Sequence, residues 1–219
     1  MGRRKKQPLD EATRAMIIHT AHDLFMEQGY RSVTTRQIAE ACGLTQPAMY
    51  HYFADKEALY TEVLRTVTED TKIAMNSLAA SEGKLRERLV KLVAYILQHM
   101  PDDLSQMERD IRHELKEENR QLITQWWREC YLLPLSSLFV EGQQTGQIRT
   151  AEQHGLDPFA ASFTLLSMIQ RKPGGPGSSA SPIPVEALAT RTVDVLLFGL
   201  ASEAGREEAT VQIKGDENG

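Results

Sequence analysis

The residues best suited to a chemical task lie between positions 33 and 56, and the task that they suit is the reading of DNA. Gln46 carries an amide that can pair with adenine in the major groove, and Ala48 offers a methyl group to thymine. Three further residues can reach bases or phosphates: Tyr50, His51 and Tyr52. Such a cluster reads a base sequence only if a helix places it in the groove.

Two short helices separated by a tight turn are predicted to position these residues. Thr34 is a good N-cap, and Gln37 three residues later completes a capping box. Gly43 can end the first helix without strain, because glycine adopts the left-handed conformation. Thr45 caps the second helix, and Pro47 lies in its first turn, where the missing N–H is not needed. The pattern predicts a helix-turn-helix, whose second helix enters the major groove.

Apolar residues give the two helices an inner face. Ile38, Ala39 and Cys42 form one stripe, and Met49 and Phe53 are expected to be buried against the first two helices. The spacing by itself also fits a plain pair of helices inside a helical core. It therefore leaves both interpretations open.

Residues 11–60 resemble the DNA-binding segment of TetR-type transcriptional regulators. The resemblance rests on two runs, Ile17-Ile18-His19-Thr20-Ala21…Leu24-Phe25…Gly29-Tyr30 and Thr34-Thr35-Arg36…Ile38-Ala39…Gly43-Leu44-Thr45…Tyr50-His51-Tyr52-Phe53…Lys56-Glu57…Leu59. It implies that four residues hold the DNA backbone, with Arg36 also within reach of a base: Thr35, Arg36, Tyr52 and Lys56. The complete predicted DNA-binding set is Thr34, Thr35, Arg36, Thr45, Gln46, Pro47, Ala48, Tyr50, His51, Tyr52 and Lys56.

The resemblance also implies a homodimer and control by a small molecule. In this family two helices of the body form a four-helix bundle with their twin, and here these are the helices on either side of residues 173–182. A dimer also follows from physics, since one recognition helix contacts too few bases for specificity and symmetric dimers read paired half-sites. The expected partners are double-stranded DNA with an inverted-repeat operator, a second copy of the chain, and a small apolar or amphipathic ligand.

The composition, with 41% apolar and 25% charged residues in 219, is typical of a globular protein. No run of about 18 apolar residues is present, so no membrane span or membrane partner is expected. The basic, polar start is not a signal segment, and the expected location is the cytoplasm. The two cysteines, Cys42 and Cys130, offer no disulfide framework and are expected to be small buried apolar groups.

The net charge of −5 is unevenly distributed along the chain. Residues 1–60 carry 8 Lys and Arg against 7 Asp and Glu, whereas residues 61–219 carry 17 against 23. Four basic residues at positions 3–6 form an arm that can lie on phosphates or enter a minor groove. A solvated, disordered tail is the alternative interpretation of this arm.

The apolar periodicity predicts an all-α chain of about nine helices, three in a DNA-binding head and six in a helical bundle that binds ligand and dimerises. Beyond the helix-turn-helix, the expected helices span about 11–28, 55–78, 84–100, 104–115, 117–143, 157–171 and 184–202. Asp10 is expected to cap the first helix, Gly29 to stop it, and Pro134 to kink the long helix. The predicted divisions are a basic arm (1–9), the DNA-binding domain (10–54), the ligand and dimerisation domain (55–204) and a disordered tail (205–219), with a flexible connector at 173–182.

Aromatic, sulfur-containing and polar side chains recur in the body at helical spacing. They fit simple core packing, and collectively they also fit an apolar ligand pocket between helices. The ligand-binding candidates are Tyr95, His99, Met107, His113, Trp126, Trp127, Tyr131 and Phe163.

No nucleophile elbow, phosphate loop or zinc-protease spacing is present, so the chain is expected not to be an enzyme. No metal site or cofactor is expected either, because scattered residues such as His99, His113 and Glu114 are more simply surface groups or ordinary polar groups of the core. The sequence thus predicts a dimeric transcriptional repressor that a small molecule releases from its operator. A constitutive DNA-binding regulator or activator without an effector is the alternative.

Overall fold

The computed structural model is all-α and describes residues 8–99, 104–153, 155–169 and 183–199, in which no strand occurs. The α-helices are α1 (Pro8–Ser32), α2 (Thr35–Ala41), α3 (Gln46–Tyr50), α4 (Lys56–Ala79), α5 (Leu85–His99), α6 (Leu104–Glu114), α7 (Glu117–Trp127), α8 (Leu133–Gln144), α9 (Pro158–Ile169) and α10 (Val185–Phe198). A π-helical segment, η1 (Arg128–Leu132), joins α7 to α8 without a break, and η2 (Ala151–Gln153) is a 3₁₀ turn. With α7, η1 and α8 taken as one continuous helix, the described helices number nine, which confirms the predicted fold class.

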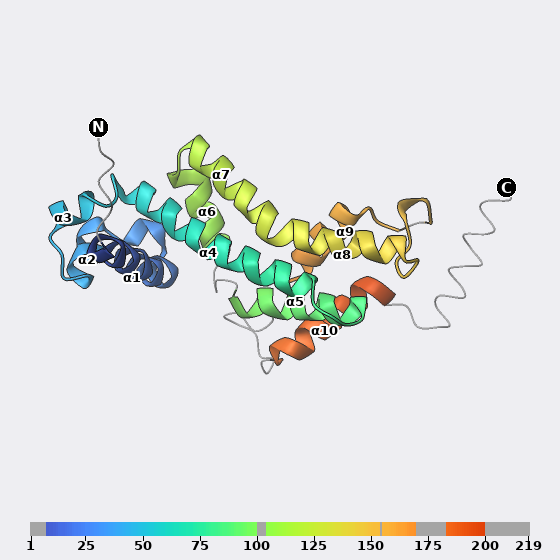
Figure 1. Cartoon of the computed structure of the whole chain (residues 1–219). Coiled ribbons are helices and arrows are strands. Elements are labelled where there is room, and N and C mark those ends of the chain that lie inside the picture. Colours follow the sequence, from blue (N-terminus) through green and yellow to red (C-terminus); the bar gives the residue numbers. More distant parts are fainter. Residues whose placement is uncertain (1–7, 100–103, 154, 170–182, 200–219) are drawn as a thin grey trace, which may run out of the picture. The chain divides into compact units, whose positions relative to one another are not determined.

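The chain divides into two compact units, which we describe separately. The first comprises residues 1–82 and 99–138, and the second comprises residues 83–98 and 139–219. The first unit thus holds the helix-turn-helix together with α4, α6 and α7 (Figure 1). The predicted domain boundary between residues 54 and 55 stays a prediction. The predicted connector (173–182), the tail (205–219) and most of the basic arm lie outside the described residues.

Helix α1 begins at Pro8, so the prediction that Asp10 caps it was wrong. Proline can open a helix because its fixed φ suits the first turn and its missing N–H is not needed there. Asp10 lies in that first turn instead. Gly29 interrupts the regular helix as predicted, with φ 78° and ψ 158°, a conformation that residues other than glycine rarely adopt, but α1 extends beyond it to Ser32.

The local signals of the helix-turn-helix are confirmed. Thr34 and Gln37 form the capping box, and Gly43 takes φ 67°. The Thr45 side chain accepts a hydrogen bond from the backbone N–H of Ala48 in α3, and the Asp55 side chain accepts one from the backbone N–H of Ala58 in α4.

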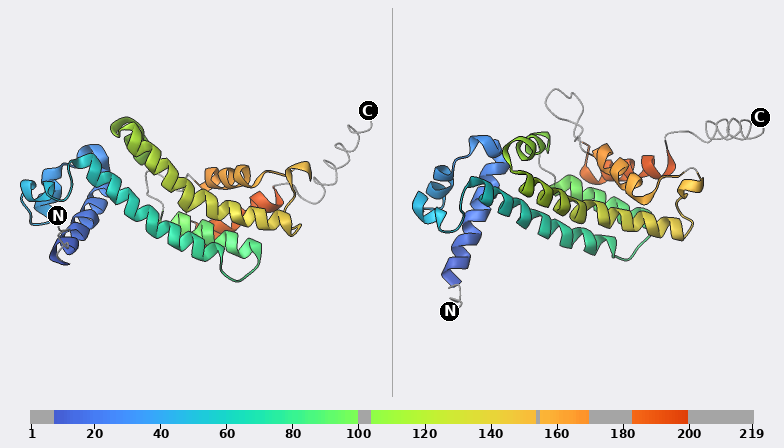
Figure 2. Two further views of the ribbon diagram at one scale, coloured as in Figure 1. Left: turned by 45° about the horizontal axis from the view of Figure 1, so that its top comes forward. Right: turned by 90° about the horizontal axis from the view of Figure 1, so that it is seen from above.

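The core of the first unit joins the DNA-binding head to α6 and α7. Its fully buried members include Ile17, Ile38, Met49 and Leu59 from α1 to α4. Ile123 of α7 belongs to the same core. Partly buried side chains of α6, of α7 and of the end of α2 pack against this core: Met107, Ile111, Trp126 and Cys42. Figure 2 shows α1 beside α4 and α6 beside α1 within this unit.

The long helix predicted over residues 117–143 is continuous, but it contains a π turn directly before Pro134. The Leu133 N–H donates to the carbonyl of Arg128, five residues back. Proline has no N–H, and its ring would clash with the carbonyl four residues before it in a regular helix. The wider π turn relieves that clash and is one of the recognised causes of a helix irregularity. Cys130 lies in this turn and is buried, as expected, whereas Cys42 at the end of α2 is only partly buried.

The second unit is built from α5, the second part of α8, α9 and α10. Leu85, Leu89, Leu92, Val93 and Ile96 of α5 are all buried, as their spacing predicts. Asp157 accepts the N–H groups of the residues at 159 and 160 and so caps α9, as its position before Pro158 predicts. An ion pair of 2.6 Å between Arg86 and Asp194 ties α5 to α10. None of the described helices is long and apolar enough to cross a bilayer.

Candidate DNA-binding surface

Helix α3 is held to the head by one buried side chain and turns its polar residues outward. Met49 is only 1% exposed and belongs to the head's core. Tyr50 is 44% exposed, and His51 and Pro47 are exposed as well. A short helix with a single apolar anchor and a polar outer face is the arrangement that a recognition helix needs.

Three of the predicted DNA-binding residues are bonded to one another. The Gln46 side-chain amide donates to Thr35 Oγ1 at 3.0 Å and to the Tyr50 hydroxyl at 3.4 Å. The hydroxyls of Thr35 and Tyr50 lie 3.2 Å apart. Because Thr35 opens α2 while Gln46 and Tyr50 lie at the two ends of α3, this polar network links the two helices on their outer side.

Arg36 lies on α2 beside this network and is exposed. Its Nε donates to Glu40 at 2.8 Å, and this bond raises the pKa of the guanidinium further above its ordinary value. An exposed pair one helical turn apart contributes little to stability, because solvent screens it. Arg36 can therefore exchange Glu40 for a phosphate or a base at little cost.

Lys56 is placed differently from the other predicted phosphate ligands. Its Nζ lies 4.2 Å from the centre of the Tyr30 ring and donates to the Arg31 carbonyl at 3.5 Å. Burial lowers the pKa of this ammonium group, and the carboxylates of Glu114 and Asp110 oppose that shift. Lys56 thus contributes positive charge at the start of α4 while stacking on the core. Tyr52 is half-buried against the same core.

Arg14 was not predicted from the sequence, although it braces the head. Its guanidinium lies 5.2 Å from the centre of the Phe53 ring and pairs with Glu62 of α4 at 2.5 Å. Arg65 also binds Glu62, at 2.7 Å. The arginine therefore connects α1, the end of the helix-turn-helix and α4, and only the fold reveals this role.

The junction between the head and α6 is a second feature that sequence patterns did not reveal. Asp110 of α6 accepts the backbone N–H of Tyr30 at 3.0 Å, and Glu114 pairs with Arg31 at 2.6 Å. Both partners follow the break at Gly29. Burial raises the pKa of Tyr30 to about 12, with further contributions from the surrounding carboxylates.

Glu57 of α4 completes this junction by capping α7. The backbone N–H of Lys116 and the side-chain amide of Asn119 both donate to Glu57 Oε1 at 2.7 Å. Lys116 itself makes no side-chain cap. Burial favours the neutral carboxyl, but these hydrogen bonds prevail and lower the pKa of Glu57. The first turns of α4 and α7 are therefore fastened together.

The predicted ligand-binding residues fall into several places. Met107 and Trp126 pack against the core of the head, and Trp127 pairs with Tyr131 at a ring distance of 6.1 Å. His99 and His113 are exposed within the first unit. Tyr95 and Phe163 belong to the second unit. Among the described residues, no three His, Cys, Asp or Glu side chains are grouped to hold a metal ion.

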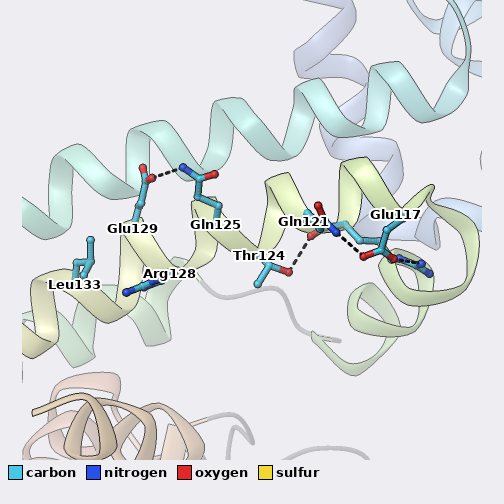
Figure 3. A pocket seen from close by; sticks show the side chains of 8 residues that line it. Glu117, Gln121, Thr124, Gln125, Arg128, Glu129 and Leu133 are labelled. Carbon is cyan, nitrogen blue, oxygen red and sulfur yellow. Dashed lines mark hydrogen bonds and ion pairs between the residues drawn. The ribbon is translucent and has the colours of Figure 1, made fainter. Parts of the chain in front are cut away.

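A depression of ≈ 630 Å³ runs along α7 and η1 of the first unit (Figure 3). Its lining is polar except for one leucine: Glu117, Arg120, Gln121, Thr124, Gln125, Arg128, Glu129 and Leu133. Many of these groups already pair with each other, as Gln125 does with Glu129 at 2.9 Å. The surface of the depression is thus mainly polar, and the apolar ligand-binding candidates Trp126 and Trp127 are not part of its lining.

Comparison with known proteins agrees with this geometry. Residues 17–63 match the family model described as bacterial regulatory proteins, tetR family. The chain is 26% identical over 201 residues to the transcriptional repressor KstR2 of Rhodococcus jostii, a match that covers 86% of this chain and 91% of that protein. Another relative is matched only in part: the regulator AcrR of Shigella flexneri is 41% identical over 63 residues, which is 29% of its length.

Solved structures show the same fold along most of the chain. A TetR/AcrR-family regulator from Thermobifida fusca superposes with a TM-score of 0.64 at 25% identity, covering 86% of this chain and 98% of that one. FadR from Bacillus subtilis, solved in complex with stearoyl-CoA, gives a TM-score of 0.69 at 22% identity, covering 85% and 99%. The second likeness concerns the fold alone.

Proposed function

Because this chain carries the DNA-binding domain of the TetR family of transcriptional regulators, we propose that it represses transcription by binding an operator through α3, and that a small-molecule ligand releases it. The observation that carries the proposal is the outward polar face of α3, set by the capped helix-turn-helix and by the single anchor Met49. The proposed place of action is the cytoplasm.

Each side chain of this surface has an assigned role. Gln46, Pro47, Ala48, Tyr50 and His51 face the base edges of the major groove. The DNA backbone is held by the remaining residues, all of which except Tyr52 lie at or beside the start of a helix: Thr34, Thr35, Arg36, Thr45, Tyr52 and Lys56. Arg36 reaches a base once it leaves Glu40.

The proposed assembly is a homodimer through α9 and α10. Phe163 is 49% exposed on α9, and Phe198 is 53% exposed on α10. Large aromatic groups left at the surface of one chain are typical of an interface that a second copy covers. A two-fold dimer presents two copies of α3 to an inverted repeat.

The packing of α6 and α7 on the head supports the proposed control by a ligand. Asp110, Glu114 and Glu57 tie these helices to the end of α1 and the start of α4, so a shift of α6 or α7 moves the DNA-binding surface. The ligand must bind the conformation that cannot bind DNA more tightly, since equal affinity for both changes nothing. We propose an amphipathic ligand near Trp126 and Trp127. An acyl-CoA is the first class to test, given the stearoyl-CoA complex of a protein with the same fold.

The experiment is a binding assay with the full chain and fragments of its own genome, followed by sequencing of the retained DNA. An enriched inverted repeat is expected. Acyl-CoAs of graded chain length are then titrated against the protein–operator complex, with tryptophan fluorescence as the readout of ligand binding.

A true effector loosens operator binding by about 5- to 150-fold, and the operator weakens ligand affinity by the same factor. A ligand that changes the fluorescence without this reciprocity is not the effector. Retention of all duplexes alike, without an enriched motif, contradicts specific DNA binding. If an operator motif is found but no ligand releases the protein from it, constitutive regulation is favoured.

A further inference from the structure

The polar network of Thr35, Gln46 and Tyr50 fixes which atoms of Gln46 are available to DNA. A glutamine amide has two N–H donors and one carbonyl oxygen that accepts. Thr35 Oγ1 and the Tyr50 hydroxyl each receive a bond from Gln46 Nε2, so the nitrogen side of the amide is turned toward these two hydroxyls. No partner of Gln46 Oε1 occurs among the residues that the structure describes.

We infer that Thr35 and Tyr50 are positioning residues that hold the Gln46 amide in one orientation, so that its carbonyl oxygen is the atom that reads the operator. The inference rests on the proposed function and deepens it. Reading of adenine by a free glutamine uses the carbonyl oxygen for N6 and the amide N–H for N7. Here the amide nitrogen faces Thr35 and Tyr50, so Gln46 presents its carbonyl oxygen to the exocyclic amine of a base.

The two hydroxyls complete the reading surface. Thr35 Oγ1 and the Tyr50 oxygen lie 3.2 Å apart, so one of the two hydroxyl groups donates its hydrogen to the oxygen of the other. The second hydroxyl hydrogen then remains for an outside acceptor such as a base N7 or a phosphate oxygen. An acceptor from one residue and a donor from another thus form a single composite reader, fixed before DNA arrives. Preorganisation of this kind limits the ordering that binding requires.

The experiment selects operators from a random duplex pool with the full-length protein and with four variants. Thr35→Val and Tyr50→Phe each remove one hydroxyl while keeping the shape of the side chain. Thr35→Ser keeps the hydroxyl. Tyr52→Phe is the matched control, because it makes the same change on a tyrosine outside the network. Thermal unfolding of every variant verifies that the fold is retained.

The wild type is expected to discriminate among bases by about 5- to 150-fold at the Gln46 position. Thr35→Val and Tyr50→Phe should each lower that discrimination at the Gln46 position by about fivefold or more, whatever affinity they also lose. Thr35→Ser, which keeps the hydroxyl, should retain the base discrimination of the wild type at the Gln46 position. Tyr52→Phe should weaken all sequences alike.

If Thr35→Val and Tyr50→Phe select the same motif as the wild type, or only lose affinity for all sequences alike, the network does not determine specificity. The proposed function then still stands. A wild type that enriches no motif overturns the proposed function, and this inference with it. The second readout uses 7-deazaadenine, which lacks the N7 acceptor, at an adenine in the Gln46 position. If that substitution weakens binding of wild type and Tyr50→Phe equally, and by about tenfold, Gln46 reads with its N–H and the proposed orientation is wrong.

Discussion

The carboxylate of Asp110 on α6 accepts the backbone N–H of Tyr30 at 3.0 Å, across 80 residues of chain. Asp110 is only 2% exposed, and Tyr30 follows directly on the non-helical Gly29, where the regular ladder of α1 is interrupted. The bond therefore satisfies a buried amide and attaches α6 to the DNA-binding head.

Replacing Asp110 by alanine should lower the free energy of unfolding by about 1–3 kcal/mol, because a buried N–H loses its acceptor. Asp110→Asn keeps a carbonyl oxygen and should lose less. Urea denaturation measures both. Glu114→Gln removes an ion pair at the surface of the same junction and should cost below about 1 kcal/mol. Equal losses in Asp110→Ala and Glu114→Gln would refute the importance of the buried bond.

Glu57→Ala should destabilise the start of α7 by about 0.5–2 kcal/mol, because Glu57 is the cap that Lys116 does not provide. Amide hydrogen exchange of the first turn of α7 localises the effect. Glu118→Ala changes an exposed carboxylate in that same turn and should leave exchange rates nearly unaltered. If the two variants exchange alike, Glu57 does not cap α7.

The stability conferred by Glu62 should depend on pH in the acid range. Hydrogen bonds from Arg65 lower the pKa of Glu62 to about 2, against the opposing effect of burial and with help from Arg14. A depressed pKa stabilises the fold while the carboxylate is ionised. The contribution is thus complete above the ordinary value of 4.5 and is lost as the pH falls toward about 2. The difference in unfolding free energy between wild type and Glu62→Gln should narrow over this range, and a constant difference would contradict it.

Lys56→Ala should weaken binding to operator and random duplexes alike, since a bond to a phosphate carries no sequence information. The slope of log affinity against log salt should become shallower by about 0.9 for each phosphate that the protein no longer neutralises. Lys91→Ala, an exposed lysine of α5, is the control and should leave the slope unchanged. A weakening confined to the operator would show that Lys56 acts on specificity instead.

Phe163→Arg should prevent dimer formation by placing an unpaired charge in the proposed interface, at a cost of several kcal/mol. Charged replacements of Val195 or Leu196 on α10 should act similarly if those side chains face the partner. Sedimentation velocity measures the mass. Ile73→Arg replaces an exposed apolar residue of α4 and should leave the dimer intact. A dimeric Phe163→Arg variant would place the interface elsewhere.

The sequence by itself determined the local architecture of the DNA-binding head. The caps Thr34 and Thr45 and the turn glycine Gly43 act within about four residues of their partners, so spacing along the chain was enough to predict them. Buried faces such as that of α5 followed from helical periodicity for the same reason.

Only the tertiary structure decided how the head is braced and what its reading residues bond to. Glu57 and Lys116 are 59 residues apart, Asp110 and Tyr30 are 80 apart, and Gln46 meets Thr35 across the turn between two helices. A carboxylate in a charged helix looks the same in sequence whether it meets water or a buried amide. Its partner is chosen by packing between distant segments, which no local spacing encodes.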